Sequence, residues 1–441
     1  MHNIRQTPPV VDKRNLVPFV LITSLFALWG FANDITNPMV SAFKKVLELD
    51  NFQASLVQMA FYGGYFTMAL PAALFVKRYS YKTGILIGLG LYATGALLFW
   101  PAAAFESYPF FLAALYILTF GLAFLETTAN PYILSLGDPK TATRRLNLAQ
   151  SFNPMGALTG LFVAQTFILG SLQSDDLDAA GHSIYETLDA SAKAAVRSAD
   201  LAVIRDPYVA LGVFVMVMFG VIFWLKMPDK SPDGSKLDLF PSLKKLARQP
   251  KYREGVLAQI FYVGAQIMCW TYIYQYAESL GIENRDAVTY AYWALGLFLT
   301  GRFVCTYLLK YVAPGRLLMW LAVAAMGCTA GAIFIEGMTG LYSLVGISFC
   351  MSLMFPTIYG IALDGLGEET EYGAAGLVMA IVGGALMPSL QGLILDIGGT
   401  GYTDTRIWGV PEVNFSFMLP FLCFLFIAVY GWRAASVHRK K

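Results

Sequence analysis

The chain has 441 residues, of which 57% are hydrophobic and only 14% are charged, and its formal net charge is +2. Soluble proteins carry about 25% charged residues, so the composition excludes an ordinary soluble enzyme and predicts a membrane protein. The near-neutral total charge says little about partners.

Apolar segments recur along the whole chain, and ~20 residues are enough for one membrane crossing. In the first half they are residues 17–39, 53–76, 84–104, 109–134, 147–170 and 207–227. In the second half they are residues 255–277, 288–310, 317–335, 340–363, 374–398 and 415–432. Because backbone groups cannot stay unpaired in lipid, each segment is predicted to be a helix. The sequence therefore predicts an all-α membrane protein with twelve transmembrane helices in two six-helix bundles.

A basic connector joins the two predicted bundles. Residues 1–227 form the first bundle, with an external loop at 171–206, and residues 254–441 form the second. The loop stretch ASAKAAVRSADLAVI fits a short amphipathic surface helix. In the cytoplasmic linker, residues 228–253, LFPSLKKLARQ predicts a helix on the inner membrane face. We interpret the linker as a solvated connector rather than a lipid or nucleic-acid site, so no nucleic-acid partner is expected.

The basic residues orient the chain. With both termini inside the cell, most of the 31 Lys and Arg fall on the cytoplasmic side, as the positive-inside rule requires. They include Lys13, Arg14, Lys77, Arg78, Lys82, Arg144, Arg145, Lys310, Arg316, Arg439, Lys440 and Lys441. No cleavable signal peptide is expected. We therefore predict a multi-pass protein of a bacterial inner membrane with cytoplasmic termini.

Asp34, in the stretch FANDITNP, is the first anomaly. It is the only acid from Leu16 to Phe43, and a carboxylate at the centre of a spanning helix costs roughly 3 kcal/mol on insertion scales. Ionisable residues inside the membrane are functional candidates by default. Asp34 is therefore a candidate for proton coupling.

Glu126, in LETTANPY, is the only charge from Pro109 to Gly137. An acid that changes protonation during a conformational cycle suits proton-coupled transport, because burial disfavours its charged form and a polar partner favours it. The alternative is a structural carboxylate that is hydrogen-bonded to a neighbouring helix or neutralised by Arg302. We favour proton coupling.

Helix five contains RLNLAQSFNPMG, in which Asn147, Gln150 and Asn153 recur at three-residue spacing and share one face. Amides suit a neutral polyhydroxylated ligand, because each can donate to one hydroxyl and accept from another. Pro154, and Asn130–Pro131 in helix four, are predicted to break their helices, and such breaks are tolerated where they line a cavity.

Helix seven places Gln259 and Gln266 seven residues apart and therefore on one face, with Tyr262 and Trp270 close by. An aromatic wall beside amides is a common way to hold a sugar. For Trp270 the alternative is plain packing.

The two halves of the sequence repeat each other weakly, as in transporters built from two parallel six-helix repeats. Small residues in helices five and eleven predict close helix approach. They include Gly156, Gly160, Gly373, Gly376 and Gly383.

Nothing in the sequence predicts an enzyme. His2, His182 and His438 are terminal or lie in the external loop, so no His-based site or metal cluster is expected within the membrane. A phosphate-binding Gly–Lys motif is also missing, which argues against an ATP-driven pump. We expect no cofactor.

Several blocks of the sequence, in order, resemble the L-fucose–proton symporter family of the major facilitator superfamily and its fucose, glucose and galactose permease relatives. They are FALWGFAN, NFQASLVQMAFYGGYF, LPAALFVKRYSYKTGI, LETTANPY, RLNLAQSFN, LAQIFYVGAQIMCWTY and the FPTIYG…YGAAGLVM region. The resemblance runs nearly end to end and is more specific for the family than for the sugar. It implies that Glu126 couples protons and that Gln150 and Asn153 contribute to a sugar site.

The sequence differs from the family pattern in two helices. In the first, family members carry an asparagine followed three residues later by an aspartate, whereas here Asp34 precedes Asn37. The two positions lie about 4.5 Å apart along one helix face, so Asp34 is expected to line the cavity and either bind the sugar or carry the proton. In the tenth helix, Phe355 stands where the family has a tyrosine.

These observations predict a secondary active transporter that takes up a neutral monosaccharide, L-fucose first, with a proton by alternating access. The predicted proton-coupling residues are Glu126 and Asp34. The predicted substrate-binding residues are Asp34, Asn37, Gln150, Asn153, Gln259, Gln266 and Trp270. The alternatives are sodium as the coupling ion, with glucose or galactose as substrate, and a non-transporting sugar sensor. We expect a monomer in the lipid bilayer.

Overall fold

The computed structural model describes residues 9–36, 42–43, 46–49, 51–175, 184–227, 239–282, 284–395, 397 and 405–436. The chain divides into two compact units, and each is described separately. The first comprises residues 1–20, 130–154 and 235–441, and the second comprises residues 21–129 and 155–234. Helices α1, α6 and α8 contribute residues to both units. The predicted boundaries of two bundles and a linker at 227 and 254 stay a prediction.

Eleven helices among the described residues are long and apolar enough to cross a membrane. The predicted eighth crossing corresponds to α14 (Asn284–Leu308), whose 25 residues are also long enough. Its first turn contains Arg285 and Asp286, and Arg302 lies further along it. Arg302 is therefore a cation within the predicted eighth crossing.

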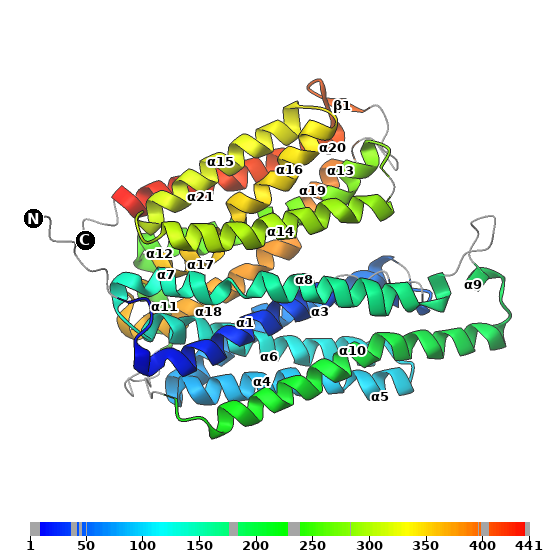
Figure 1. Ribbon diagram of the computed structural model, residues 1–441, viewed down its shortest axis with the longest axis horizontal. Coiled ribbons are helices and arrows are strands. Elements are labelled where there is room, and N and C mark those ends of the chain that lie inside the picture. Colours follow the sequence, from blue (N-terminus) through cyan, green and yellow to red (C-terminus); the bar gives the residue numbers. More distant parts are fainter. Residues whose placement is uncertain are drawn as a thin grey trace, which may run out of the picture. The chain divides into compact units, whose positions relative to one another are not determined.

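The second unit is a group of helices, most of them long (Figure 1). They are α1 (Leu16–Thr36), α3 (Asn51–Arg78), α4 (Tyr81–Leu97), α5 (Phe99–Ala104), α6 (Tyr108–Ser135), α8 (Asn153–Val163), α9 (Ile184–Thr187) and α10 (Ala190–Trp224). Helix α10 packs against α4 and α5. Ser80 begins α4, and its side chain accepts a hydrogen bond from the Thr83 backbone N–H.

Helix α1 is fixed within this unit by close contacts. Added Cβ atoms at Gly156 and Gly160 would overlap the backbone carbonyls of Ala27 and Phe31, so α8 lies directly against α1. The close approach predicted for these two glycines is confirmed. Near the end of α1, the Thr36 hydroxyl lies 3.0 Å from the Tyr208 hydroxyl. The helix that carries Asp34 is therefore held along its length.

Helix α10 extends further than the sequence indicated. The stretch predicted as a separate surface helix begins α10 and continues without a break to Trp224, over 35 residues. Asp189 caps its first turn, accepting from the Ala192 N–H at 2.7 Å, and this bond lowers the pKa of Asp189 below its usual range. The expected separate helix was wrong: Pro207 lies at the junction, but α10 continues through it, and no glycine interrupts residues 190–211.

The first unit contains most of the remaining helices (Figure 1). They are α7 (Ala142–Gln150), α11 (Leu239–Arg248), α12 (Pro250–Thr271), α13 (Ile273–Ser279), α14, α15 (Pro314–Phe334), α16 (Met338–Met351), α17 (Met354–Leu363), α18 (Thr370–Met379), α19 (Gly383–Leu395), α20 (Glu412–Ser416) and α21 (Met418–Ser436). A short antiparallel hairpin pairs β1 (Arg406–Ile407) with β2 (Val410–Pro411). The helix predicted in the linker is present as α11.

Helix α12 is central to this unit and packs against α17, α19 and α21. Gly376 and Gly383 leave no room for a Cβ, because the Tyr252 hydroxyl and the Ile260 carbonyl occupy that space. The close approach predicted from these small residues is confirmed here as well. Helix α12 ends at Thr271, and α13 continues after Tyr272.

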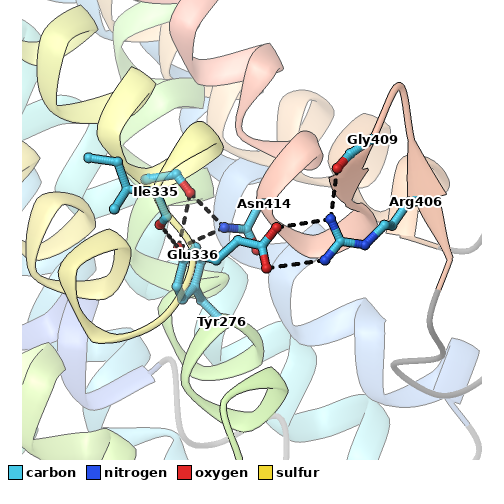
Figure 2. Close-up of polar contacts among 7 residues, drawn as sticks. Tyr276, Ile335, Glu336, Arg406, Gly409 and Asn414 are labelled. Atoms are coloured by element: carbon cyan, nitrogen blue, oxygen red, sulfur yellow. Dashed lines mark hydrogen bonds and ion pairs between the residues drawn. The ribbon is translucent and has the colours of Figure 1, made fainter.

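A polar cluster joins four elements at one end of this unit (Figure 2). Asn414 of α20 donates to the Tyr276 hydroxyl at 2.8 Å and to the Ala332 carbonyl at 2.9 Å. Tyr276 of α13 donates in turn to the Ala332 carbonyl at 3.0 Å. In the hairpin, Arg406 makes two contacts with Glu336, of 2.9 and 3.1 Å. The cluster holds α13 and the ends of α15 and α20 together.

Candidate functional site

The two predicted coupling carboxylates, Asp34 on α1 and Glu126 on α6, are both half-buried and both belong to the second unit. Helix α3 is near both of them. Tyr62 lies within electrostatic range of Asp34, and Tyr65 lies within range of Glu126. Because these tyrosines are three residues apart, they share one face of α3. The structure thus places the two acids along one face of the same helix.

Asp34 lies between a polar neighbour and a buried apolar neighbour on α1. The Asn33 side chain makes a hydrogen bond to the Asp34 carboxylate, and the neighbouring Ile35 is fully buried. Asn37, the other predicted sugar contact on this helix, lies outside the described residues.

Helix α6 passes through Pro131 without a break and continues to Ser135. The break predicted at Asn130–Pro131 is therefore wrong. Proline removes only one backbone N–H from the helix, and the other hydrogen bonds of α6 hold its last turn together. Helix five behaves as expected, because α7 ends at Gln150 and α8 begins at Asn153, directly before Pro154. Proline is favourable at the start of a helix, where its missing N–H has no partner to lose.

A chain of hydrogen bonds runs through the amides of the first unit. The Gln150 Nε2 donates to the Asn130 Oδ1 at 2.8 Å, and Arg302 donates to the Gln150 Oε1 at 3.4 Å. All three side chains are at most 5% exposed. The chain joins α6, α7 and α14.

Asn147, one turn before Gln150, faces another helix. It is fully buried, and its Nδ2 donates to the Thr357 hydroxyl of α17 at 3.1 Å. Its Oδ1 is buried without a hydrogen-bond partner among the described residues. Asn153 begins α8 and is half-buried. The predicted polar face of helix five therefore divides at the break, with Asn147 and Gln150 on one side and Asn153 on the other.

The predicted residues of helix seven all lie on α12. Gln259 is fully buried, and neither atom of its amide has a partner among the described residues. Gln266 is half-buried. Because an unsatisfied buried amide is costly, Gln259 has free capacity for a ligand or for water.

Aromatic rings accompany these amides. The Tyr262 ring lies 6.1 Å from the Phe355 ring, and Phe355 stacks on Tyr359 at 6.2 Å. Trp270 donates its indole N–H to the Ser348 hydroxyl at 3.1 Å, and its ring meets Phe298 edge-on at 5.1 Å. Trp270 is thus fixed in place by these contacts, while a smaller part of its surface stays accessible.

Sequence reasoning did not assign a binding role to Asn130, Arg302 or Thr357. For Asn130 a signal was available, because it follows Glu126 by four residues and therefore lies on the same face of α6. For Arg302 the signal was a cation in the middle of a predicted membrane crossing. Thr357 could not have been identified, since a threonine within a predicted helix is unremarkable without its tertiary contact.

Comparisons with known proteins identify the family of the chain. Residues 21–386 match the Major Facilitator Superfamily. The L-fucose-proton symporter of Haemophilus influenzae is 58% identical over 97% of this chain and 99% of its own length. The L-fucose-proton symporter of Escherichia coli is 36% identical, over 94% and 92%. A glucose/galactose transporter of Brucella abortus is 34% identical, over 93% and 92%.

Solved structures of transporters also match this chain. The crystal structure of the superfamily transporter FucP in its outward conformation matches with a TM-score of 0.84 and 34% identity, covering 96% of this chain and 99% of that one. The proton:xylose symporter XylE shares the fold alone, with a TM-score of 0.69 and 13% identity over 94% of each chain. The chain therefore belongs to the major facilitator superfamily, in the group of transporters that includes the L-fucose–proton symporters.

Proposed function

We propose that this transporter imports L-fucose by proton-coupled symport and alternating access. The observation that carries the proposal is the placement of Glu126, the only acid of α6. It lies one turn before Asn130, which holds the amide of Gln150 at 2.8 Å. A group that can gain a proton thus lies one helical turn from Asn130, whose side chain is hydrogen-bonded to a predicted sugar contact. The 58% identity to an L-fucose-proton symporter supports the choice of sugar and ion.

The roles divide by chemistry. Glu126 takes up the coupling proton, and Asp34 either shares this task or binds a sugar hydroxyl. Amide and aromatic side chains contact the sugar, because amides donate and accept at once and rings cover its apolar face. These contacts are Asn37, Gln150, Asn153, Gln259, Gln266 and Trp270.

The transport cycle follows from these roles. Protonation of Glu126 on the outside removes a charge from the membrane interior and allows the sugar to bind. The protein then changes to its inward-facing form, in which the sugar and the proton leave. We assign both termini to the cytoplasm, the protein to a bacterial inner membrane and the working form to a monomer, with no cofactor beyond the coupling ion.

The direct test is uptake of labelled L-fucose into sodium-free proteoliposomes under an inward proton gradient. We expect accumulation that an uncoupler abolishes. Unlabelled galactose and glucose serve as competitors, because the Brucella relative is a glucose/galactose transporter. Uptake that appears only with sodium, or only with another sugar, contradicts the proposed ion or substrate.

Glu126→Gln tests the proton site. We expect accumulation to fall by at least about tenfold, while exchange of labelled for unlabelled L-fucose continues, because exchange needs no net proton movement. Asp206→Asn is a suitable control, since its carboxylate is 65% exposed and pairs with the adjacent Arg205. Full accumulation by Glu126→Gln rules out this residue as the proton carrier.

A further inference from the structure

Arg302 is an unusual cation. It is 3% exposed, and its Nε has no hydrogen-bond partner among the described residues. Its guanidinium lies 4.9 Å from the centre of the Phe298 ring and 3.4 Å from the Gln150 Oε1. In the part of the chain that the structure describes, Arg302 forms no ion pair. A buried charge without a carboxylate is costly, so packing alone does not account for it.

Arg302 determines the direction of the amide chain. A guanidinium can only donate hydrogen bonds, so the Gln150 atom that faces it must be the carbonyl oxygen. The Gln150 Nε2 must then face Asn130, and it donates to the Asn130 Oδ1 at 2.8 Å. A neutral amide could otherwise rotate by half a turn and exchange its donor and acceptor ends. The charge at position 302 excludes that alternative.

Gln150 retains binding capacity in this orientation. An amide has two lone pairs on oxygen and two N–H groups, and the two bonds described use one of each. One acceptor and one donor remain, in a fixed order, for two neighbouring hydroxyls of a sugar. A rotated amide would offer them in the opposite order.

We propose that Arg302 is a positioning residue for the sugar: it fixes the orientation of the Gln150 amide and, through it, the order of donor and acceptor offered to the substrate. This inference rests on the proposed function, because it takes Gln150 as a sugar contact. It assigns to the α14 cation a role in substrate affinity rather than in fold or proton transfer.

The test is the concentration dependence of L-fucose uptake by Arg302→Met, Arg302→Gln and Arg302→Lys. We expect KM to rise about tenfold in the Met and Gln variants, as for the loss of one charge-assisted hydrogen bond, with a maximal rate within about twofold of the wild type. The Lys variant keeps a donor-only cation and should recover part of the affinity. Arg316→Met is the control, because Arg316 is an exposed arginine of the same unit.

A double-mutant cycle with Gln150→Ala separates positioning from general damage. If Arg302 acts through Gln150, Arg302→Met should change KM by less than about twofold once the amide is gone. The proposal is overturned if the fold-changes in KM of Arg302→Met and Gln150→Ala simply multiply in the double variant. It is also overturned if all three Arg302 variants lower the maximal rate and leave KM unchanged. If Arg302→Met fails to fold, Arg302→Gln takes its place in the cycle. Absence of L-fucose uptake by the wild type contradicts the proposed function instead, and is established first.

Discussion

Two buried arginines of the same unit, Arg145 and Arg302, have opposite surroundings. Arg145 is fully buried, and its guanidinium donates to the carbonyls of Ile133 and Val10 at 2.7 and 3.0 Å and to the Thr141 hydroxyl at 3.2 Å. It also donates to the Leu134 carbonyl. Arg302 has one acceptor, at 3.4 Å, and an aromatic ring. Burial is the same in both cases, whereas hydrogen-bond satisfaction is not.

The difference separates a structural role from a functional one. The last carbonyls of a helix have no partner within it, and a cation is favourable at that end. Arg145 supplies both a charge and donors to the end of α6, so its presence is explained by the fold. Arg302 caps no helix end. A side chain that is buried and incompletely satisfied keeps hydrogen-bonding capacity for another molecule.

Arg145→Met is expected to have the largest effect on stability. It leaves several buried acceptors at the end of α6 without donors, and each costs about 1–3 kcal/mol, so the free energy of unfolding should fall by at least about 3 kcal/mol. Thermal unfolding of the purified protein in detergent measures the loss. The KM for L-fucose of the folded fraction should not change, in contrast to Arg302→Met.

Arg144→Met is the matched control, because Arg144 is the neighbouring arginine but is only half-buried. Arg145→Lys should recover little, since an ammonium group has three donors and lacks the planar geometry of guanidinium. Equal stability of the Arg145 and Arg144 variants would contradict the structural role of Arg145.

From the sequence, the fold class and the polar residues within the crossings could be predicted. The tertiary surroundings of those residues could not. Composition and segment length were enough to predict the crossings, and Glu126 was identified as a lone acid. Arg145 was counted among the cytoplasmic charges, because two adjacent arginines at the start of a helix are usually solvated. Its burial depends on the chain folding back so that Arg145 reaches the end of α6 and the Val10 carbonyl, which is 135 residues away in sequence. Tertiary contacts of this kind leave no local pattern.

The two prolines illustrate the same limit. Pro131 and Pro154 both predicted breaks, and only the helix before Pro154 is interrupted. Local sequence gives the missing N–H of each proline, but packing determines whether the helix continues. The Arg302–Gln150–Asn130 chain was unpredictable for a similar reason, since it requires three helices to meet.

Asn15→Ala is expected to have an intermediate effect on the free energy of unfolding. The Asn15 Nδ2 donates to the Leu136 carbonyl at 2.8 Å, and so satisfies the same end of α6 as Arg145 with a single neutral bond. We expect a loss of about 1 kcal/mol in the free energy of unfolding, measured by thermal unfolding. Lys13→Ala, at an exposed position two residues earlier, should change stability much less. A loss as large as that of Arg145→Met would mean that the N-terminal segment, rather than the guanidinium, stabilises this end.

Arg406→Ala is expected to have the smallest effect, although Arg406 has the best ion-pair geometry of the three arginines. It makes a two-point contact with Glu336, at 2.9 and 3.1 Å, and donates to the Gly409 carbonyl at 2.8 Å (Figure 2). Both side chains of the pair are about half exposed, at 50% and 54%. Water can therefore hydrogen-bond to Glu336 once the arginine is removed, and exposed ion pairs contribute only about 0.2–1 kcal/mol to the free energy of unfolding. This contribution should disappear at ~1 M salt, where the Debye length is about 3 Å, whereas the effect of Arg145→Met should persist. If Arg406→Ala lowered the free energy of unfolding by more than ~1 kcal/mol at every salt concentration, hydrogen-bond geometry would matter more than burial for the effect of an arginine. The contrast between Arg145 and Arg302 would then lose its physical basis.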